Sequence, residues 1–397
     1  MKRLFNPKKR LLTIILCFIP IFLSGCWDRT EINDLAIVVG VGLDRTDNGE
    51  IELSAQIVNP KVIGSAGMNG GGGQGEQQPV IVKTATGKTI YDARSKLQEK
   101  TSRRLFEGHN RVIIIGKSLA EAGIRKHIDF FARFPVPRLR ANVFFTNGKA
   151  TDILKVIPSF EDGESAEAAR ELASLKIGLN VTTKDLLQQL ASTSGNTALP
   201  RITESKSELG DGLKVNGTAI FKNNKLTGQI DDKVTRGLLW LTDEIETASV
   251  TIQPKDAEGY ISFKLLRSST ELIPTIKNGK WKMTVQITTE DDVAENETKL
   301  DMMDPKTVQK LEKQMEENID KRIQLVLDEV QTGMEADVFG FGETFERHYP
   351  KRWKQAKDKW NEKFPEIEVV IKSDAKIRRP GRSSGPQGVP QEKEKKK

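Results

Sequence analysis

Few side chains in this 397-residue chain could do nucleophilic or metal chemistry. The three histidines, His109, His127 and His348, lie far apart in the sequence and match no metal-ligand spacing. None of them stands beside a serine or cysteine in a recognisable hydrolase motif. The two cysteines are Cys17 and Cys26. The surroundings of Cys26 are the most informative, because it directly follows a basic and then apolar beginning of the chain.

Residues 1–25 have the pattern of a secretory signal. They contain five basic residues and no acidic ones, and the basic residues precede an apolar run over 11–23 that only Thr13 interrupts. A positive region, an apolar region and small residues at its end are typical of a signal peptide. A helix over this run spans about 20 Å, which is short of the roughly 20 residues that a bilayer core requires. We therefore expect a cleaved signal rather than a transmembrane helix.

The residues Leu23-Ser24-Gly25-Cys26 resemble the bacterial lipobox, in which the cysteine thiol receives a diacylglycerol and becomes the mature N-terminus. The resemblance implies a diacylglycerol thioether and an N-acyl group on Cys26. Two acyl chains anchor a protein stably, whereas one chain binds only marginally. The alternative is an ordinary signal that happens to end before a cysteine. We expect a chain that is tethered to membrane lipid, folds outside the cytoplasm and keeps no thiol for a disulfide, a metal or a nucleophile.

The net charge of +7 lies mainly at the two ends of the chain. Removal of residues 1–25 takes away five positive charges, and the tail 381–397 holds about +3 of the remainder. The folded part is therefore close to neutral, which argues against nucleic acid as a partner. The tail is rich in Gly, Pro and Ser before its final charged residues, and we expect it to be disordered.

Two glycine-containing segments could be mistaken for nucleotide sites. Gly87-Lys88-Thr89 lies between a predicted strand and a predicted helix, but Val82 stands where a phosphate-binding loop needs its first glycine. Gly40-Val41-Gly42 lacks the third glycine and the helix of a dinucleotide fingerprint, so close strand packing or a bulge is preferred. The carboxylate pairs Asp231-Asp232 and Asp291-Asp292 carry no acid–base signature without a pocket. We expect no catalytic residue, no cofactor and no metal.

The first half of the chain alternates strand and helix patterns. The runs 35–43 and 51–57 flank Asn48-Gly49, which predicts an antiparallel hairpin with one solvent-exposed face. Thr182 and Asp185 resemble a capping box. The polar residues 192–211 are broken by glycine and proline and predict a domain boundary. Further strands are predicted over 80–85, 112–115 and 140–146, helices over 89–100, 119–122, 124–131, 164–176 and 184–191, and a glycine-rich mobile loop over 64–79.

The second half begins with another predicted hairpin and contains the clearest helix. Asp304-Pro305 opens this helix, an apolar stripe follows at spacings of three and four, and Gly333 closes it. Strands are predicted over 213–221, 226–230, 260–273, 281–288 and 367–371, and further helices over 234–241 and 351–363. Interleaved strands and helices with hairpins favour α+β over a doubly wound parallel sheet.

These patterns predict a lipid-anchored multi-domain ectodomain of mixed, largely antiparallel sheets with packed helices. The expected parts are the signal 1–25, an N-terminal α/β domain over 27–200, a C-terminal α+β domain over 213–380 and the tail. Whether the N-terminal part divides again is left open.

Residues 345–360 combine six basic residues with Trp353 and Trp360. A helix that lies on a membrane surface has this composition. The preferred interpretation is an amphipathic helix whose tryptophans pack into its own domain.

Two segments carry a family resemblance. The first runs from Gly25 through Cys26-Trp27-Asp28 to Ala36 and on through residues 39–44. The second covers residues 336–342, followed by Tyr349-Pro350, the two tryptophans and the end of the last strand at 377–381. Together with Gly-Thr-Ala-Ile-Phe-Lys at 217–222, they resemble the C-subunit lipoproteins of spore germinant receptors, the Ger(x)C family.

The resemblance implies a non-enzymatic subunit of a nutrient germinant receptor, required for receptor assembly or signalling in spore germination. Such a subunit is lipid-anchored to the outer face of the spore's inner membrane, beside polytopic A and B subunits. Only Cys26 is carried over as a functional position. The alternative is a solute-binding lipoprotein that presents a small molecule to a permease, but that class favours lobes of parallel βαβ units around a cleft. We expect no direct binding of a small molecule.

Overall fold

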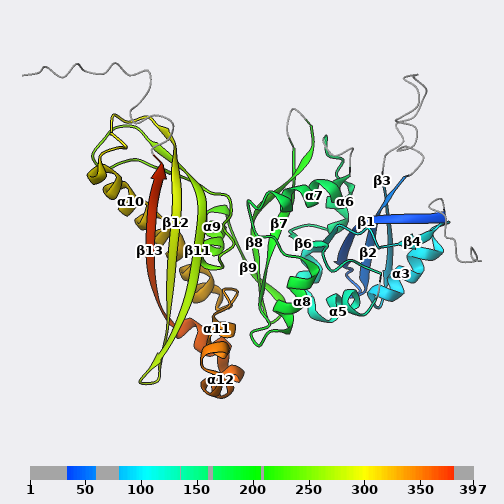
Figure 1. Ribbon diagram of the computed structural model, residues 1–397. Coiled ribbons are helices and arrows are strands. Elements are labelled where there is room, and N and C mark those ends of the chain that lie inside the picture. Colours follow the sequence, from blue (N-terminus) through cyan, green and yellow to red (C-terminus); the bar gives the residue numbers. More distant parts are fainter. Residues whose placement is uncertain (1–33, 60–79, 135, 160–163, 207–209, 380–397) are drawn as a thin grey trace, which may run out of the picture.

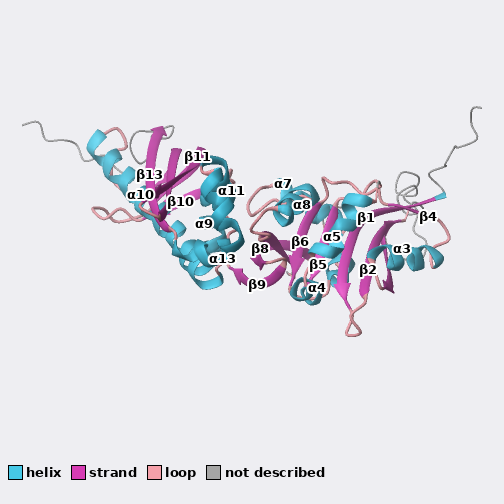
Figure 2. Cartoon of the chain, turned by 90° about the horizontal axis from the view of Figure 1, so that it is seen from below, coloured by secondary structure: helices cyan, strands magenta, loops and turns pink. Residues whose placement is uncertain are grey.

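The computed structural model describes residues 34–59, 80–134, 136–159, 164–206 and 210–379 (Figure 1). The predicted signal, Cys26, the glycine-rich segment 64–79 and the tail 381–397 lie outside the described residues. The described part forms two mixed sheets with helices packed on them, which confirms the predicted α+β class (Figure 2). None of the described helices combines the length and apolar character needed to cross a bilayer.

The first sheet has the strand order β3-β2-β1-β5-β6-β7-β8-β9, and β4 pairs with β1. Its centre is a parallel block of β1, β5, β6 and β7, which the hairpin signals did not reveal. Antiparallel strands flank this block on both sides. The strands are β1 (Leu35–Arg45), β2 (Ile51–Val58), β3 (Val80–Gly87), β4 (Arg104–Phe106), β5 (Val112–Gly116), β6 (Asn142–Thr146), β7 (Thr197–Ser205), β8 (Gly212–Lys222) and β9 (Lys225–Ile230).

Helices cover both faces of the first sheet. One core contains apolar residues of α3 (Ile90–Glu99), α5 (Arg125–Arg133) and α8 (Thr183–Ala191), and a separate core contains those of α6 (Ala150–Lys155) and α7 (Ser165–Ser174). A short helix, α4 (Lys117–Ala122), follows β5. The predicted hairpin of β1 and β2 is confirmed, but the prediction of a solvent-exposed face is wrong because α6 and α7 cover it.

The polar residues 192–211, where a domain boundary is predicted, contain strand β7, which the sequence patterns did not predict. Ala198, Leu199 and Ile202 of this strand are buried. The pairing of β7 with β8 shifts register between Pro200 and Ile202, and such an irregularity accommodates a proline that cannot donate a backbone hydrogen bond. The first sheet continues through β8 and β9, and the division at 200–213 remains a prediction.

The second sheet has the order β10-β11-β12-β13. Its first three strands are antiparallel, and β13 runs parallel to β12. Asn278 and Gly279 form the turn that joins β11 and β12, with positive φ angles of 49° and 77°. The strands are β10 (Ser249–Ile252), β11 (Ile261–Lys277), β12 (Lys280–Asn296) and β13 (Glu368–Arg379), and the helices are α9 (Asp232–Leu241), α10 (Pro305–Val326), α11 (Phe341–His348), α12 (Pro350–Ala356) and α13 (Trp360–Lys363).

Helix α10 begins as predicted, but the helical run that it opens ends later than predicted. The Asp304 carboxylate accepts from the backbone N–H groups of Lys306 and Thr307, which caps the helix. The chain then continues into a π-helical segment, Leu327–Met334. Glu335, with φ of 52°, ends it, so Gly333 is not the terminator.

Helix α10 also covers β13, which pairs only with β12 in the second sheet. The backbone N–H of Ala375 donates to Glu316 Oε1 at 3.2 Å, and that of Ile377 donates to Glu312 Oε1 at 3.0 Å. Ser373 Oγ donates to Asp320 at 2.5 Å. Three acidic residues on one face of the helix therefore hold the last strand.

Helix α9 joins the two sheets, because it packs on α10 and on β8. Its apolar residues from Val234 to Leu241 are buried. A Cβ at Gly237 would lie 2.1 Å from the Arg322 carbonyl oxygen of α10, so this close approach requires glycine.

Candidate functional site

The predicted lipidation residue lies close in sequence to the middle of the first sheet. Eight residues separate Cys26 from Leu35, the first residue of β1. An extended segment of this length spans about 30 Å at most. An acyl group on Cys26 would therefore hold the start of β1 within that distance of a lipid surface.

The Gly87-Lys88-Thr89 segment is a helix start and not a phosphate site. Thr89 Oγ1 accepts from the backbone N–H of Asp92 at 3.1 Å and caps α3. The Asp92 carboxylate in turn accepts from the backbone N–H of Lys88 at 2.8 Å. The Asp92 carboxylate thus occupies a backbone donor that a phosphate would use, and the helix predicted over 89–100 is confirmed with Thr89 as its cap.

The Gly40-Val41-Gly42 segment allows α6 to approach β1 closely. A Cβ at Gly42 would lie 3.1 Å from the Ala150 Cβ, and one at Gly40 would lie 2.9 Å from Leu154 Cδ2. The interpretation as close packing of a strand is therefore confirmed.

The three histidines remain apart in the fold. His109 Nδ1 lies 3.3 Å from the Arg138 guanidinium, and His348 Nδ1 lies 2.9 Å from the Thr344 carbonyl oxygen. His127 is half-buried, and burial together with Lys126 and Arg45 lowers its pKa to about 4. Within the described ranges, no group of three or more His, Cys, Asp or Glu side chains could hold a metal ion.

The two carboxylate pairs have structural partners. Asp231 accepts from the backbone N–H of Val234 at 2.9 Å and caps α9, while Asp232 accepts from the backbone N–H of Gly217 at 2.5 Å. Thr289 Oγ1 donates to buried Asp291 at 2.8 Å. Burial raises the pKa of Asp291 to about 6.

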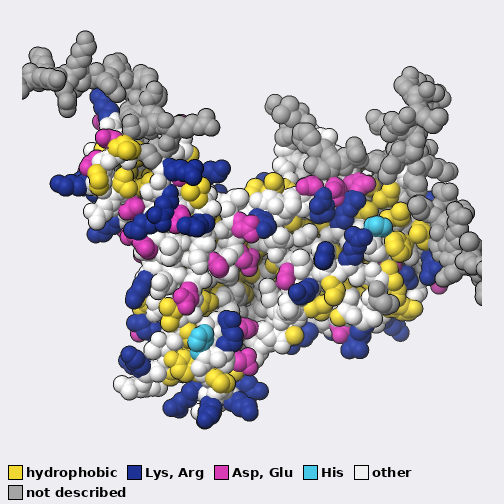
Figure 3. Space-filling model, viewed as in Figure 1, with side chains coloured by type: hydrophobic (Ala, Val, Ile, Leu, Met, Phe, Trp, Pro, Cys, Tyr) yellow, Lys and Arg dark blue, Asp and Glu magenta, His cyan; other side chains and the backbone are white. Residues whose placement is uncertain are grey.

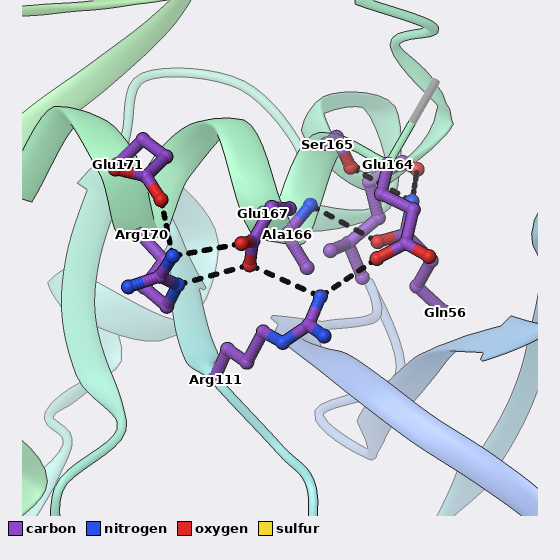
Figure 4. A network of polar contacts seen from close by, with 9 residues as sticks. Gln56, Arg111, Glu164, Ser165, Ala166, Glu167, Arg170 and Glu171 are labelled. Carbon is purple, nitrogen blue, oxygen red and sulfur yellow. Dashed lines mark hydrogen bonds and ion pairs between the residues drawn. The ribbon is translucent and has the colours of Figure 1, made fainter. Parts of the chain in front are cut away.

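A buried polar network joins β2 to α6 and α7 (Figure 4). Gln56 Nε2 donates to the Leu154 carbonyl and to Ser165 Oγ, both at 2.9 Å, and Gln56 Oε1 accepts from the backbone N–H of Ala166 at 3.0 Å. Ser54 bonds to Thr151 in the same layer. The alternating polar residues of β2 therefore face α6 and α7 and not solvent, contrary to the prediction of a solvent-exposed face.

The same network continues toward the surface through Arg111, which follows Asn110 just before β5. Its Nη1 contacts Glu164 at 2.7 Å and Glu167 at 3.0 Å, as Figure 4 shows. Glu167 also pairs with Arg170, whose side-chain hydrogen bond lowers the pKa of that carboxyl. The start of α7 is therefore fixed by side chains from β2 and from the β5 region.

A buried carboxylate in the first sheet fixes the start of α6. Asp44, at 3% exposure, accepts from the backbone N–H groups of Ala150 at 2.9 Å and Thr151 at 3.3 Å. Burial raises the pKa of Asp44 above its ordinary value. A Cβ at Gly116 would lie 1.8 Å from its Oδ1, so the neighbouring strand leaves room only for glycine.

A second buried carboxylate lies in the 336–342 motif. Asp337 Oδ1 accepts from the backbone N–H groups of Phe339 and Phe341, both at 3.2 Å. Its Oδ2 accepts from the backbone N–H of Gly342 and from Trp360 Nε1, both at 2.8 Å. Burial and nearby Glu343 raise its pKa to about 6.

Aromatic rings enclose this carboxylate. Trp353 and Trp360 meet edge to face with centroids 4.8 Å apart, and they are 2% and 1% exposed. The interpretation that both pack into their own domain is confirmed, so neither ring is available to a membrane. The surrounding rings of this cluster are those of Trp281, Phe339, Phe341, Phe345 and Phe364.

A cleft of about 350 Å³ lies between the first sheet and the Asp337 segment. Gln189, Ser194 and Asn196 line it on the side of α8 and β7, and Glu244 and Glu343 line it on the other side. These groups can hydrogen-bond a small polar molecule, but they form no nucleophile–base pair.

Comparisons with known proteins cover both halves of the chain. Residues 28–204 match the family described as "Spore germination protein N-terminal domain", and residues 216–381 match "Spore germination B3/ GerAC like, C-terminal". Spore germination protein KC of Bacillus subtilis (strain 168) is 28% identical over 96% of this chain and 98% of its own length. The putative spore germination protein YfkR of the same organism is 30% identical over 90% of this chain and 94% of its own length.

The crystal structure of the GerBC protein has a similar fold. Its TM-score is 0.53 at 20% identity, and the match covers 85% of this chain and 96% of that chain. At this identity the likeness concerns the fold alone. With the sequence matches along nearly the whole length, the chain belongs to the GerAC-like family of spore germination proteins.

Proposed function

We propose that this protein is a non-enzymatic lipoprotein subunit of a nutrient germinant receptor and serves receptor assembly or signalling in spore germination. The observation that carries the proposal is the match to spore germination proteins over both domains. The chemistry-bearing motifs support it, because in the described residues they cap helices and pack strands. A binding and signalling role needs this kind of rigid scaffold rather than a reactive centre.

The proposal places the protein on the outer face of the spore's inner membrane, anchored through acylated Cys26. The lipobox resemblance and the eight-residue connection to β1 support this arrangement. Cys26→Ala is expected to release the protein or leave an uncleaved precursor, and to slow germination. The measurement is membrane fractionation together with mass spectrometry of the mature N-terminus. Ser24→Ala keeps a small residue two positions before the cysteine. It is the matched control, and normal processing is expected. Signal cleavage and membrane retention without Cys26 would contradict the anchor.

The expected partners are the polytopic A and B subunits. Affinity capture of the tagged protein from detergent-solubilised spore membrane should recover at least one multi-spanning protein. Recovery of the tagged protein alone, under detergent conditions that preserve other membrane complexes, would count against a receptor subunit.

The solute-binding alternative would have to use the cleft between the first sheet and the Asp337 segment. Its volume falls in the range of small-molecule sites. Calorimetry of the purified protein with amino acids and sugars is expected to show no saturable heat. Micromolar binding that Asn196→Leu abolishes would instead favour the alternative.

A further inference from the structure

One end of the second sheet is strongly basic. The β11–β12 turn meets the helical segment 350–363 there, and together they contribute eight basic residues, which we call the basic tip. Seven of them are exposed and Lys363 is half-buried. In Figure 3, Lys and Arg side chains gather at the lower end of the molecule, where Figure 1 places α12. The basic tip consists of Lys277, Lys280, Lys351, Arg352, Lys354, Lys357, Lys359 and Lys363.

The basic tip carries an excess of positive charge. None of its eight residues forms an ion pair with another described residue, whereas basic residues elsewhere on the sheet do, such as Lys282 with Glu368 at 2.8 Å. Asp358, Glu362 and Glu366 lie in the same region, which leaves a net charge of about +5. Unpaired like charges on one surface create a potential that attracts an anionic partner.

A groove opens within the basic tip. Its volume is about 690 Å³, and Arg352, Lys359 and Lys363 line it together with Trp281 and Tyr349. Lys363 Nζ lies 5.3 Å from the centre of the Trp281 ring. Both aromatic side chains are half-buried, so their edges reach the groove. Aromatic rings beside lysine and arginine are the composition of protein surfaces at the level of lipid headgroups.

We propose that the basic tip is a second membrane contact that binds anionic phospholipid headgroups. The inference rests on the proposed function, because the Cys26 tether brings the protein to a lipid surface. It differs from an inserted helix, since Trp353 and Trp360 are buried and only charged and half-buried groups face outward.

The start of β1 and the basic tip lie at opposite ends of the described molecule. The start of β1 is at the far end of the first sheet from α12 in Figure 1. A tether at one end and an electrostatic contact at the other would lay the ectodomain along the membrane. A headgroup layer suits the charge distribution better than an acidic peptide does, because the charges come from two separate segments around a rounded end.

The test uses the lipidated full-length protein reconstituted into vesicles. Residues 34–379 contain no cysteine, so one introduced at Gln355 in the basic tip can carry a fluorophore. A cysteine at Glu295, at the other end of β12, is the matched control, since about 50 Å of strand separates it from Lys280. Both positions are exposed. Energy transfer to a headgroup-labelled lipid reports how close each position lies to the membrane.

In vesicles of phosphatidylcholine with 30% phosphatidylglycerol, transfer from position 355 is expected to exceed that from 295 at least twofold. The difference should vanish in pure phosphatidylcholine and at about 0.5 M salt. The triple change Lys351→Glu, Lys354→Glu and Lys357→Glu should abolish it, because each basic residue contributes roughly fivefold to partitioning. The control Lys306→Glu, Lys313→Glu and Lys321→Glu changes the same charge on exposed positions of α10 and should leave it intact.

Equal transfer from both positions in anionic vesicles would overturn the proposal. So would an unchanged signal in the triple variant together with loss of its multi-spanning partners in affinity capture, which would assign the basic tip to an acidic protein segment. Failure of the protein to float with vesicles of pure phosphatidylcholine would instead refute the tether. In that case co-sedimentation of the triple variant and its control with anionic vesicles still decides the role of the basic tip.

Discussion

Asp44 and Asp337 perform the same structural task in the two halves of the molecule. Each is a buried carboxylate that accepts hydrogen bonds from backbone N–H groups at the start of a helix, α6 for Asp44 and α11 for Asp337. Asp44 has two backbone donors. Asp337 has three, and a fourth donor comes from the indole of Trp360.

The difference shows what the 336–342 motif does. Asp44 joins one helix to one strand, whereas Asp337 also ties α11 to α13 across 23 positions of sequence. The residues that carry part of the family resemblance are therefore the centre of a packed aromatic cluster. Similarity in this motif therefore preserves the hydrogen bonds and the ring packing around the Asp337 carboxylate.

Asp337→Ala is expected to have the largest effect on the free energy of unfolding. It leaves four donors without their acceptor in a dry site, which should lower the free energy of unfolding by about 4 kcal/mol. Urea unfolding followed by tryptophan fluorescence measures this, because Trp281, Trp353 and Trp360 belong to the cluster. Asp358→Ala removes an exposed carboxylate nearby and should change the value by less than about 0.5 kcal/mol.

Asp44→Ala is expected to lower the free energy of unfolding by a smaller amount. Two backbone donors at the start of α6 lose their acceptor, and we expect about 3 kcal/mol from the same measurement followed by far-ultraviolet circular dichroism. Exposed Asp47 in the β1–β2 turn is the control for an alanine substitution. A loss of unfolding free energy as large as that of Asp337→Ala would contradict the expectation that the loss grows with the number of donors.

The stability that Asp337 contributes is expected to depend on pH. The pKa of Asp337 is raised from 3.8 to about 6, so between these values the folded state holds more protons than the unfolded state. Its contribution to stability is therefore present below about pH 4 and is lost as the pH rises through 6. Asp337→Asn removes this titration, and the advantage of the wild type should grow by on the order of 2 kcal/mol between pH 7 and 4.

His127 acts in the opposite direction, because burial lowers its pKa to about 4 and acid then favours the unfolded state. This contribution is common to both proteins and cancels in the difference between wild type and Asp337→Asn. Parallel stability curves over this pH range would show that the Asp337 carboxyl does not titrate as the structure indicates.

The smallest effect is expected from Trp360→Phe. It removes one of the four donors and keeps most of the ring, so unfolding should require about 1 kcal/mol less. Asp337 keeps its three backbone donors in this variant. A loss close to that of Asp337→Ala would mean that the indole, and not the backbone amides, holds the carboxylate.

Most helices and strands could be predicted because the patterns that indicate them lie within a few neighbouring residues. The Thr182–Asp185 capping box and Asp304 cap the helices that they were expected to cap. Strand β7 was missed because its burial comes from neighbouring strands and not from a strongly apolar sequence. The polar face of β2 was misread because Ser165 and Ala166, which cover Gln56, lie about 110 positions away.

The functional candidates also fall into two groups, those that a local motif predicts and those that only the fold brings together. Cys26 could be named from an adjacent pattern, and it lies outside the described residues. The donors around Asp337 could not be foreseen, because its partner Trp360 is positioned by three intervening helical segments. The groove of the basic tip likewise forms only when β12 and α12 meet.

The Glu312 and Glu316 carboxylates of α10, which accept from backbone N–H groups of β13, bear on what would happen if the proposed tether gathered many copies on one membrane. An open edge strand of twelve residues is a template on which a strand of another molecule can form. Proteins tethered to one surface meet often, so strand pairing between the sheet edges of neighbouring copies would lead to fibrils. Because α10 already occupies two amides of this edge, a neighbouring copy would have to displace a whole helix before it could add a strand.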